Sequence, residues 1–321
     1  MKVQEKNIDY KKSRGYEVRL LQAKKSMPHY HTHDLEIIYC LHGSVHVSFA
    51  HEQVVLRENE IVAVDYMDIH HLYAEEENLL LVFHLDLHQM DMPWKDLKYM
   101  LFSCESVHLY PYQMPAFRSV VDLMLALACA NFQDDALPGE MPDKLTGRLL
   151  SLLVHYFNWF NYENQDDSMN PELQDRFYRI LRYCSEHYQE RISLAQLAEQ
   201  EHISRNYFSQ FIGNTVFQSF GQMVQYIRCY NAEHMLLCTD LPNMEISYAC
   251  GFSDPKYFYA AFKTWWGCTP GEHRQAMQRY MASPADVKVL SSRRSVSILR
   301  DYITRWHLYK CCTEETIVPA H

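Results

Sequence analysis

Short apolar runs separated by polar breaks fill the chain from residue 16 to about residue 88. The runs are rich in β-branched and aromatic residues, and they include residues 35–40, 44–49, 61–64 and 79–83. This rhythm is typical of strands that have a buried face and are separated by turns, as in an all-β barrel or sandwich. We therefore predict that residues 1–112 form an all-β barrel or sandwich.

Longer apolar segments replace these runs after Pro115. Residues 117–132 and 145–160 contain no proline and no strand-like alternation, so they predict two helices joined by a loop at residues 134–139. We assign residues 113–165 to a helical linker that includes both. The helices are too apolar to face water, and we expect them to pack against the barrel.

Short segments with the 3.6-residue period of a helix run from residue 172 to residue 279. Within them the pair Tyr207-Phe208 recurs as Tyr257-Phe258, which indicates two copies of one helical unit. In each copy a short helix, a tight turn and a second helix are expected, which is the helix-turn-helix pattern. One helix over residues 220–238 is expected to join the copies.

Capping residues mark the ends of these helices. Ser193 and Ser204 stand where N-caps are expected in the first copy. In the second copy Gly251 permits a left-handed turn, and Ser253 or Asp254 then caps the next helix. The second helix of each copy is thus predicted to be a recognition helix, the element that enters the major groove of DNA.

The second copy carries the most specific motif. Residues 245–263, followed by Gly267, Thr269-Pro270 and Arg274, resemble the C-terminal signature of the AraC family of bacterial transcription regulators. Upstream segments are similar to the rest of that family's DNA-binding domain, so the resemblance covers about residues 173–276. It implies a sequence-specific regulator that binds double-stranded DNA, contacts RNA polymerase and forms a homodimer. The resemblance also implies that the helix pair at residues 117–132 and 145–160 joins two copies of the chain, a second role that is compatible with packing against the barrel.

The outward faces of the two recognition helices supply the expected DNA contacts. Asn206 and Gln210 carry amides that pair with adenine, and Lys256 suits guanine or phosphate. The full set of expected contacts is Arg205, Asn206, Ser209, Gln210, Pro255, Lys256, Tyr259 and Lys263. Their inward neighbours, expected in the core, are Tyr207, Phe208, Phe258 and Phe262.

Charge is divided unevenly along the chain. The net charge of −10 argues against nucleic-acid binding by the chain as a whole, but residues 171–321 hold 16 Lys and Arg against 15 Asp and Glu, a net of +1. Gln210, Gly213 and Asn214 stand where the family usually has basic residues, so fewer phosphate contacts are expected. An alternative function is therefore a regulator that acts by protein contact, with weakened DNA binding.

The barrel region has its own resemblance. Residues 28–43 and 59–70 resemble the cupin-type sensing domain of many AraC-family members. This implies a small-molecule effector, a sugar or related metabolite, bound in the mouth of the barrel. Strand alternation is expected to place His29, His31 and His33 on one face. The expected effector-binding residues are His31, His33, Glu36 and His70.

A metal ion is the alternative occupant of the same place. The spacing His29-x-His31-x4-Glu36-x6-Gly43 matches the metal-binding form of cupins, and together with His70 these groups suit Zn, Mn or Fe. We predict no cofactor and no catalytic residue, and we keep a metal-binding cupin enzyme tethered to a DNA-binding domain as an alternative function. Six further histidines are expected at the surface: His42, His46, His51, His71, His84 and His88.

The predicted fold is α+β and multidomain, with an N-terminal cupin-like β-barrel, a helical linker and a C-terminal all-α domain of two helix-turn-helix units at residues 172–279. Residues 280–321 form a basic, amphipathic extension that contacts phosphate, docks on the sensor domain or is poorly ordered. The ten cysteines contain no Cys-x-x-Cys pair, which argues against a thiolate zinc site. We expect a cytoplasmic protein with no membrane partner, because residues 1–16 are polar and no long apolar span is present.

Overall fold

The structure, a computed structural model, describes residues 2–10, 15–87, 113–132, 141–157 and 171–306. Its strands are β1 (Gln4–Glu5), β2 (Tyr16–Lys25), β3 (His29–Tyr30), β4 (Asp34–His42), β5 (Ser44–Phe49), β6 (Glu52–Arg57), β7 (Ile61–Val64), β8 (His70–Tyr73), β9 (Leu79–Asp86) and β10 (Asp286–Val289). Its helices are α1 (Met114–Phe132), α2 (Met141–Tyr156), α3 (Pro171–Glu186), α4 (Leu194–Gln200), α5 (Arg205–Gly213), α6 (Phe220–Cys238), α7 (Asn243–Ala249), α8 (Pro255–Trp266), α9 (Pro270–Met281) and α10 (Ser292–Trp306). The loop expected at 134–139, residues 158–165 of the expected linker and His88 lie outside the described residues.

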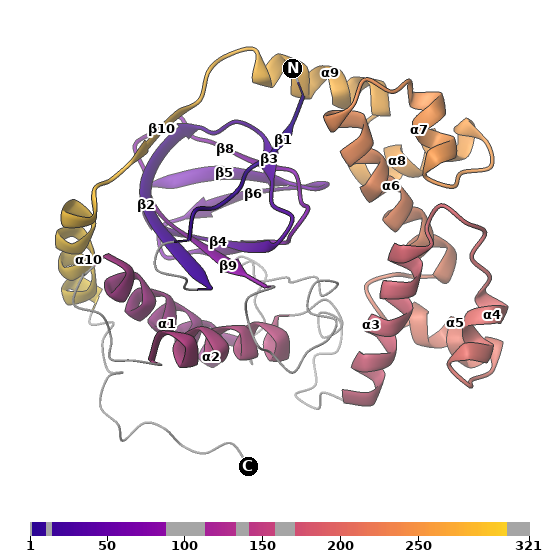
Figure 1. The fold of residues 1–321 in the computed structure, drawn as a ribbon, viewed down its shortest axis with the longest axis horizontal. Helices are drawn as coiled ribbons and strands as arrows, with labels where there is room; N and C mark the ends of the chain where they lie inside the picture. The colour runs from indigo at the N-terminus through magenta and orange to yellow at the C-terminus, as the bar shows by residue number, and fades with distance from the viewer. Residues whose placement is uncertain (1, 11–14, 88–112, 133–140, 158–170, 307–321) are drawn as a thin grey trace.

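A strongly curved sheet forms the N-terminal domain (Figure 1). Its strands run in the order β1-β3-β8-β2-β9-β4-β7, and β5 pairs with both β6 and β8. Because side chains alternate along a strand, Ile37 packs in the cluster shared with the helices, whereas its neighbour Ile38 packs in the core of the sheet domain. The strand-rich first domain and the helical second one confirm the predicted α+β class.

Helices α1 and α2 lie together against the sheet domain. α1 packs against α2 and β2, and the Asn131 side chain donates a hydrogen bond of 3.0 Å to the Val18 carbonyl. α1 is long and apolar enough to cross a membrane by length and composition alone, but 61% of that stretch is buried inside the fold. Its apolar character is accounted for by packing, which was one of the two roles expected for the helix pair.

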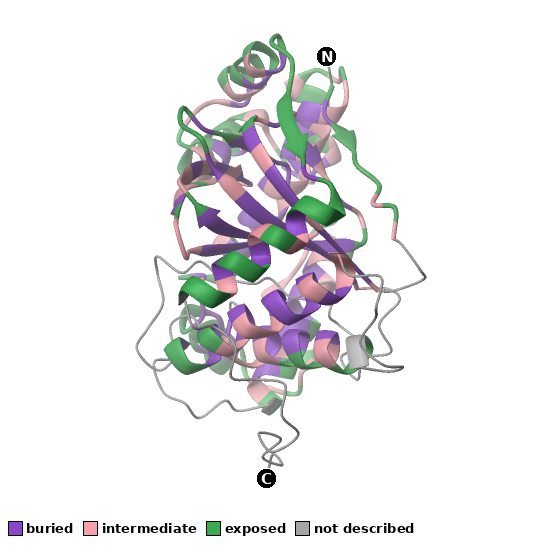
Figure 2. Cartoon of the chain, turned by 90° about the vertical axis from the view of Figure 1, so that its left-hand side faces the viewer, coloured by how far each residue is buried: buried purple, intermediate pink, exposed green. Residues whose placement is uncertain are grey.

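The chain returns to the sheet domain after α9. Strand β10 pairs antiparallel with β2, and α10 packs on α1. The Lys25 ammonium also donates to the carbonyl oxygen of Ser283 at 2.9 Å. Figure 2 shows α10 lying across this side of the molecule with its exposed residues outward. Three roles were considered for the extension. Its described residues dock on the sensor domain, which was one of the three.

Candidate functional site

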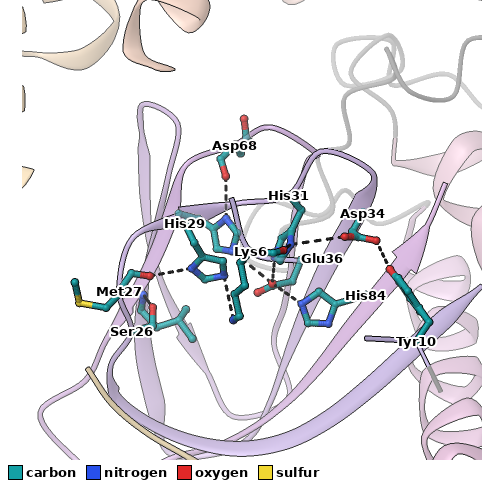
Figure 3. A network of polar contacts seen from close by, with 12 residues as sticks. Lys6, Tyr10, Ser26, Met27, His29, His31, Asp34, Glu36, Asp68 and His84 are labelled. Carbon is teal, nitrogen blue, oxygen red and sulfur yellow. Dashed lines mark hydrogen bonds and ion pairs between the residues drawn. The ribbon is translucent and has the colours of Figure 1, made fainter. Parts of the chain in front are cut away.

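Four ionisable side chains meet inside the sheet domain (Figure 3). His29 on β3, His31 just beyond it, Glu36 on β4 and His70 on β8 are all buried. One ligand atom from each lies within 4.8 Å of the others. His29 and His70 are paired directly across β3 and β8, and this register brings the two rings together. The structure thus gathers four of the five side chains that the sequence suggested for an effector or a metal.

The Glu36 carboxylate is the centre of this cluster. Its Oε2 lies 3.1 Å from His31 Nε2 and 3.4 Å from His70 Nε2. A fourth ring, His84, approaches the same oxygen at 2.9 Å. Burial opposes ionisation of Glu36, but the neighbouring charges of His70 and His84 and hydrogen bonds from the surrounding rings hold the pKa of its carboxyl well below the ordinary value. Burial also lowers the pKa of His84 to about 4.

Four histidines lie elsewhere than the sequence analysis placed them. His51 and His71, expected at the surface, are half-buried against Trp265 and Tyr280, and the other two are His33 and His84. His33 is exposed, because β3 ends at Tyr30 and β4 begins only at Asp34, so strand alternation does not extend across the irregular segment between them. His84, expected at the surface, is 1% exposed because the β4–β9 register places it opposite Glu36. That pairing involves residues 48 positions apart, so no local pattern in the sequence signals it.

Lys6 closes the cluster on the side of β1. Its ammonium lies 3.3 Å from His29 Nε2, and its carbonyl oxygen lies 2.6 Å from His31 Nδ1. Burial lowers the pKa of Lys6, although the negative charge of Glu36 acts in the opposite direction. The sequence analysis missed this residue, because a lone lysine near the N-terminus belongs to no motif.

The recognition helices of the second domain begin at well-formed caps. Ser204 Oγ accepts a hydrogen bond of 3.2 Å from the backbone of Tyr207, and the Asp254 carboxylate accepts one of 2.8 Å from the backbone of Lys256. Gly251 has a φ of +81°, the left-handed conformation predicted for it. Ser193 is the N-cap residue of α4 with an extended backbone, as expected, but its side chain makes no capping hydrogen bond.

The outward faces of α5 and α8 are exposed, with Pro255 half-buried at the start of α8. The exposed residues of the expected set are Arg205, Asn206, Ser209, Gln210, Lys256, Tyr259 and Lys263. Phe208, Phe258 and Phe262 are fully buried, as expected. Tyr207 was expected in the core but is 43% exposed, because Phe208, Phe211 and Ile212 form the buried stripe of α5 and leave Tyr207 at its edge.

The segment at residues 65–70 lies between the cluster and α6. On one side the backbone N–H of Met67 donates to the His31 carbonyl at 2.6 Å, and His70 Nδ1 lies 2.9 Å from the Asp68 carbonyl. On the other side, Tyr230 donates to the Tyr66 carbonyl at 3.2 Å, and His234 Nε2 contacts the carbonyl of Met67. The buried cluster and the helix that joins the two recognition units therefore share one short segment.

Comparison with known families divides the chain in the same way. The profile of the AraC-like ligand binding domain matches residues 13–140, and a helix-turn-helix domain profile matches residues 197–276. The chain belongs to the AraC family. The first match contains the buried cluster, and the second contains both recognition helices of this AraC-family chain.

Individual relatives are similar over parts of their length. The uncharacterised helix-turn-helix type regulator YijO of Escherichia coli K12 is 30% identical over 135 residues, which are 41% of this chain and 47% of YijO. An uncharacterised regulator of the same type from Staphylococcus aureus strain MRSA252 is 20% identical over 75% of this chain and 31% of its own. The matches thus span less than half the length of these relatives.

Solved structures align with each part of the chain. The C-terminal domain of AraT, a response regulator from Geobacillus stearothermophilus, is 29% identical over 33% of this chain and 86% of its own, with a TM-score of 0.30. ToxT from Vibrio cholerae is 12% identical over 82% of this chain and 98% of its own, with a TM-score of 0.41.

Proposed function

We propose that this AraC-family chain is a sequence-specific DNA-binding transcription regulator whose N-terminal domain binds an effector. The observation that carries the proposal is the pair of capped helices α5 and α8, each with a buried aromatic side and an exposed polar side. Such helices expose donors and acceptors for base edges while their inner faces hold the unit together. No catalytic step is part of the proposal.

The spacing of the two units supports binding to adjacent turns of DNA. α6 has 19 residues, and at about 1.5 Å per residue it is about 28 Å long. Successive major-groove faces on one side of DNA lie about 34 Å apart. We therefore assign base contacts to Arg205, Asn206, Ser209 and Gln210 of α5 in one segment of the groove. We assign the next segment of the groove to α8, with contacts from Pro255, Lys256, Tyr259 and Lys263.

The effector is placed at the buried cluster around Glu36. An organic molecule such as a sugar, which the resemblance suggests, would find its polar partners in His31, Glu36 and His70. Binding there acts on α6 through residues 65–70, a coupling that typically amounts to ~1–3 kcal/mol. The proposal also includes a homodimer and contact with RNA polymerase. Because α10 covers part of α1, a dimer through this helix pair has to use the remaining surface of α1 or that of α2.

Genome-wide mapping of DNA bound by the full chain tests this function. We expect enrichment of one asymmetric or directly repeated motif. Purified protein should then bind that motif at least ~1,000-fold more tightly than scrambled DNA of equal length. Equal affinity for both DNAs would contradict sequence-specific regulation and would favour the alternative of a regulator that acts by protein contact.

A further inference from the structure

The hairpin of β5 and β6 reaches from the sensor domain towards α6 (Figure 1). Its strands pair as far as Phe49 and Glu52, so Ala50 and His51 form a two-residue tip. Ala50 has a φ of +44°, which costs free energy in a residue other than glycine and persists only where the surroundings hold it. The backbone N–H of Ala50 donates to the Ile69 carbonyl at 3.3 Å. The tip is therefore anchored to β8 and its approach, with His51 at the end.

The His51 ring lies among three aromatic rings of the DNA-binding helices. Its centroid is 5.5 Å from that of Tyr226 on α6, and 5.6 and 5.7 Å from those of Trp265 and Trp266 at the end of α8. Tyr226 and Trp265 meet it nearly edge to face, at 77° and 79°, which is a favoured arrangement of aromatic pairs. Burial lowers the pKa of His51, although the charge of Glu233 opposes this, so the neutral imidazole contacts its neighbours as an aromatic ring.

The same rings form the junction between the two recognition units. Tyr226 lies 5.7 Å from Phe217, which follows α5 and is buried with the core of the first unit. Trp266 stacks on Phe262 of the second unit at 4.7 Å and 14°. Trp265 packs against the core that contains Phe217 and also against the core that contains Phe262. A shift of these rings therefore changes the angle between α5 and α8.

Other contacts of the sensor domain lie along one face of α6. Tyr226, Tyr230 and His234 are spaced four residues apart, so they share one side of the helix. Tyr230 and His234 contact the backbone of residues 66 and 67, and these contacts hold α6 itself. His51 reaches beyond α6 to α8, so its contacts bear on the relative placement of the two units.

The hairpin is also paired with a strand of the buried cluster. Phe49 pairs with His70 in the β5–β8 register, and His70 Nε2 lies 3.4 Å from Glu36 Oε2. A displacement of β8 at His70 is therefore carried to the neighbouring tip by the pairing of the two strands.

We propose that His51 is a positioning residue for DNA recognition, which sets the angle between α5 and α8 and so the separation of the two DNA segments that the chain prefers. The inference rests on the proposed function, because it needs both helices to read one site. His51 takes no part in base readout, since the contacts assigned to α8 lie between Pro255 and Lys263, whereas the two tryptophans follow them at the end of the helix. Loss of the ring relaxes the preference for spacing and leaves the base preference of each unit unchanged.

DNA sites that differ only in the number of base pairs between the two segments of the bound motif test this role in the full chain. The wild type should prefer one spacing. In His51→Ala the affinity for that spacing should fall at least ~5-fold, because several aromatic contacts are lost, whereas the affinity for adjacent spacings should change less than ~2-fold. His51→Phe keeps an aromatic ring and should keep the wild-type preference.

His46→Ala is the matched control, because His46 is half-buried on β5 of the same hairpin and its ring contacts Tyr73 within the sensor domain. It should keep the wild-type preference. The proposal is overturned if His51→Ala keeps that preference, or if it loses affinity equally at every spacing, since a uniform loss indicates general destabilisation. If His51→Ala does not fold, His51→Asn replaces it with the same expectation, because asparagine suits a two-residue hairpin turn.

Hydrogen exchange of the full chain without DNA tests the contact separately. The amides of residues 262–267 should exchange faster in His51→Ala than in the wild type, and those of His46→Ala should not. Unchanged exchange in His51→Ala would overturn the contact. If exchange is faster but the wild type binds no DNA specifically, the contact stands, whereas the proposed function and the spacing role are both overturned.

Discussion

Tyr39 on β4 and Tyr302 on α10 form a hydrogen bond of 2.8 Å between their hydroxyl groups, although 263 positions separate them in the chain. Tyr302 also donates to the side-chain oxygen of Asn59. Both tyrosines are buried, with exposed fractions of 2% and 8%. The extension is therefore attached to the sensor domain by a specific polar link as well as by apolar packing.

Replacing Tyr302 by Phe should lower the free energy of unfolding by about 1–2 kcal/mol. The change leaves the polar groups of Tyr39 and Asn59 without their buried partner. Urea unfolding measures this effect. Tyr73→Phe serves as the control, because Tyr73 is 43% exposed and its loss should change stability by less than ~0.5 kcal/mol. Equal effects of the two substitutions would count against a structural role for the Tyr302 hydroxyl.

Lys256→Ala and Lys263→Ala should each weaken DNA binding on every sequence and reduce the slope of log affinity against log salt by about 1. Each exposed ammonium on α8 is expected to neutralise one phosphate, and the counterions released produce the slope. Gel-shift titrations at several salt concentrations measure it. Lys288→Ala, at an exposed position on β10, is the control and should leave the slope unchanged.

Gln210→Ala should alter the preference at one base step rather than the overall affinity. Its exposed amide on α5 can form two hydrogen bonds with the edge of one adenine. Losing such a pair of bonds reduces the discrimination between adenine and the other bases by about 1–3 kcal/mol. Binding measured against a library of single-base variants of the site shows the effect. A uniform loss of affinity across that library would mean that Gln210 contacts the backbone of the DNA.

Gly251→Ala should destabilise the second unit by more than about 1 kcal/mol. The φ of Gly251 is +81°, and an added Cβ would lie 2.5 Å from the Tyr188 carbonyl oxygen. Gly147→Ala is the matched control, since it lies inside α2 and, among the described residues, no atom beyond the local helix backbone lies within 4 Å of the added Cβ. There the same change should stabilise by about 0.5–1 kcal/mol. Thermal unfolding of both variants tests the pair.

Tyr230→Phe and His234→Ala should reduce the effect of the bound ligand on DNA affinity while leaving ligand binding intact. Both side chains lie on α6 and contact the backbone of residues 66 and 67 rather than the cluster itself. Calorimetry measures ligand binding, and gel shifts with and without ligand measure the coupling. If the ligand changes the DNA affinity of the double variant as much as that of the wild type, the effect of ligand binding reaches the recognition helices by another path.

Local pattern predicted much of the fold. The short apolar runs predicted the principal strands, and the 3.6-residue period predicted α6 with its observed bounds. Ser204, Asp254 and Gly251 were correctly placed because capping and left-handed turns depend on a few neighbouring residues. The first-domain helices begin three and four residues earlier than expected, since helix ends depend on packing as well as on sequence.

The details that the sequence analysis missed depend on long-range pairing. His84 enters the cluster only through the β4–β9 register, and His33 leaves it because the strand is broken at that point. The contact of Lys6 with His29 spans 23 positions. The amphipathic pattern of α10 predicted a helix, but the surface that it covers is set by tertiary packing. Local periodicity contains none of these relationships.

The chain enters the DNA-binding helices from the sensor domain and leaves them to rejoin it through β10 and α10 (Figure 1). Those helices are in this sense an insertion into the sensor domain, and they also contact it directly through the hydrogen bonds of Tyr230 to Tyr66 and of Val3 to Leu237. A unit joined to its neighbour at several places along one side moves with that neighbour, whereas a unit on a single flexible tether tumbles freely. Any effector-driven movement of the sensor domain would then carry α6 with it and change the angle of the recognition helices to the DNA.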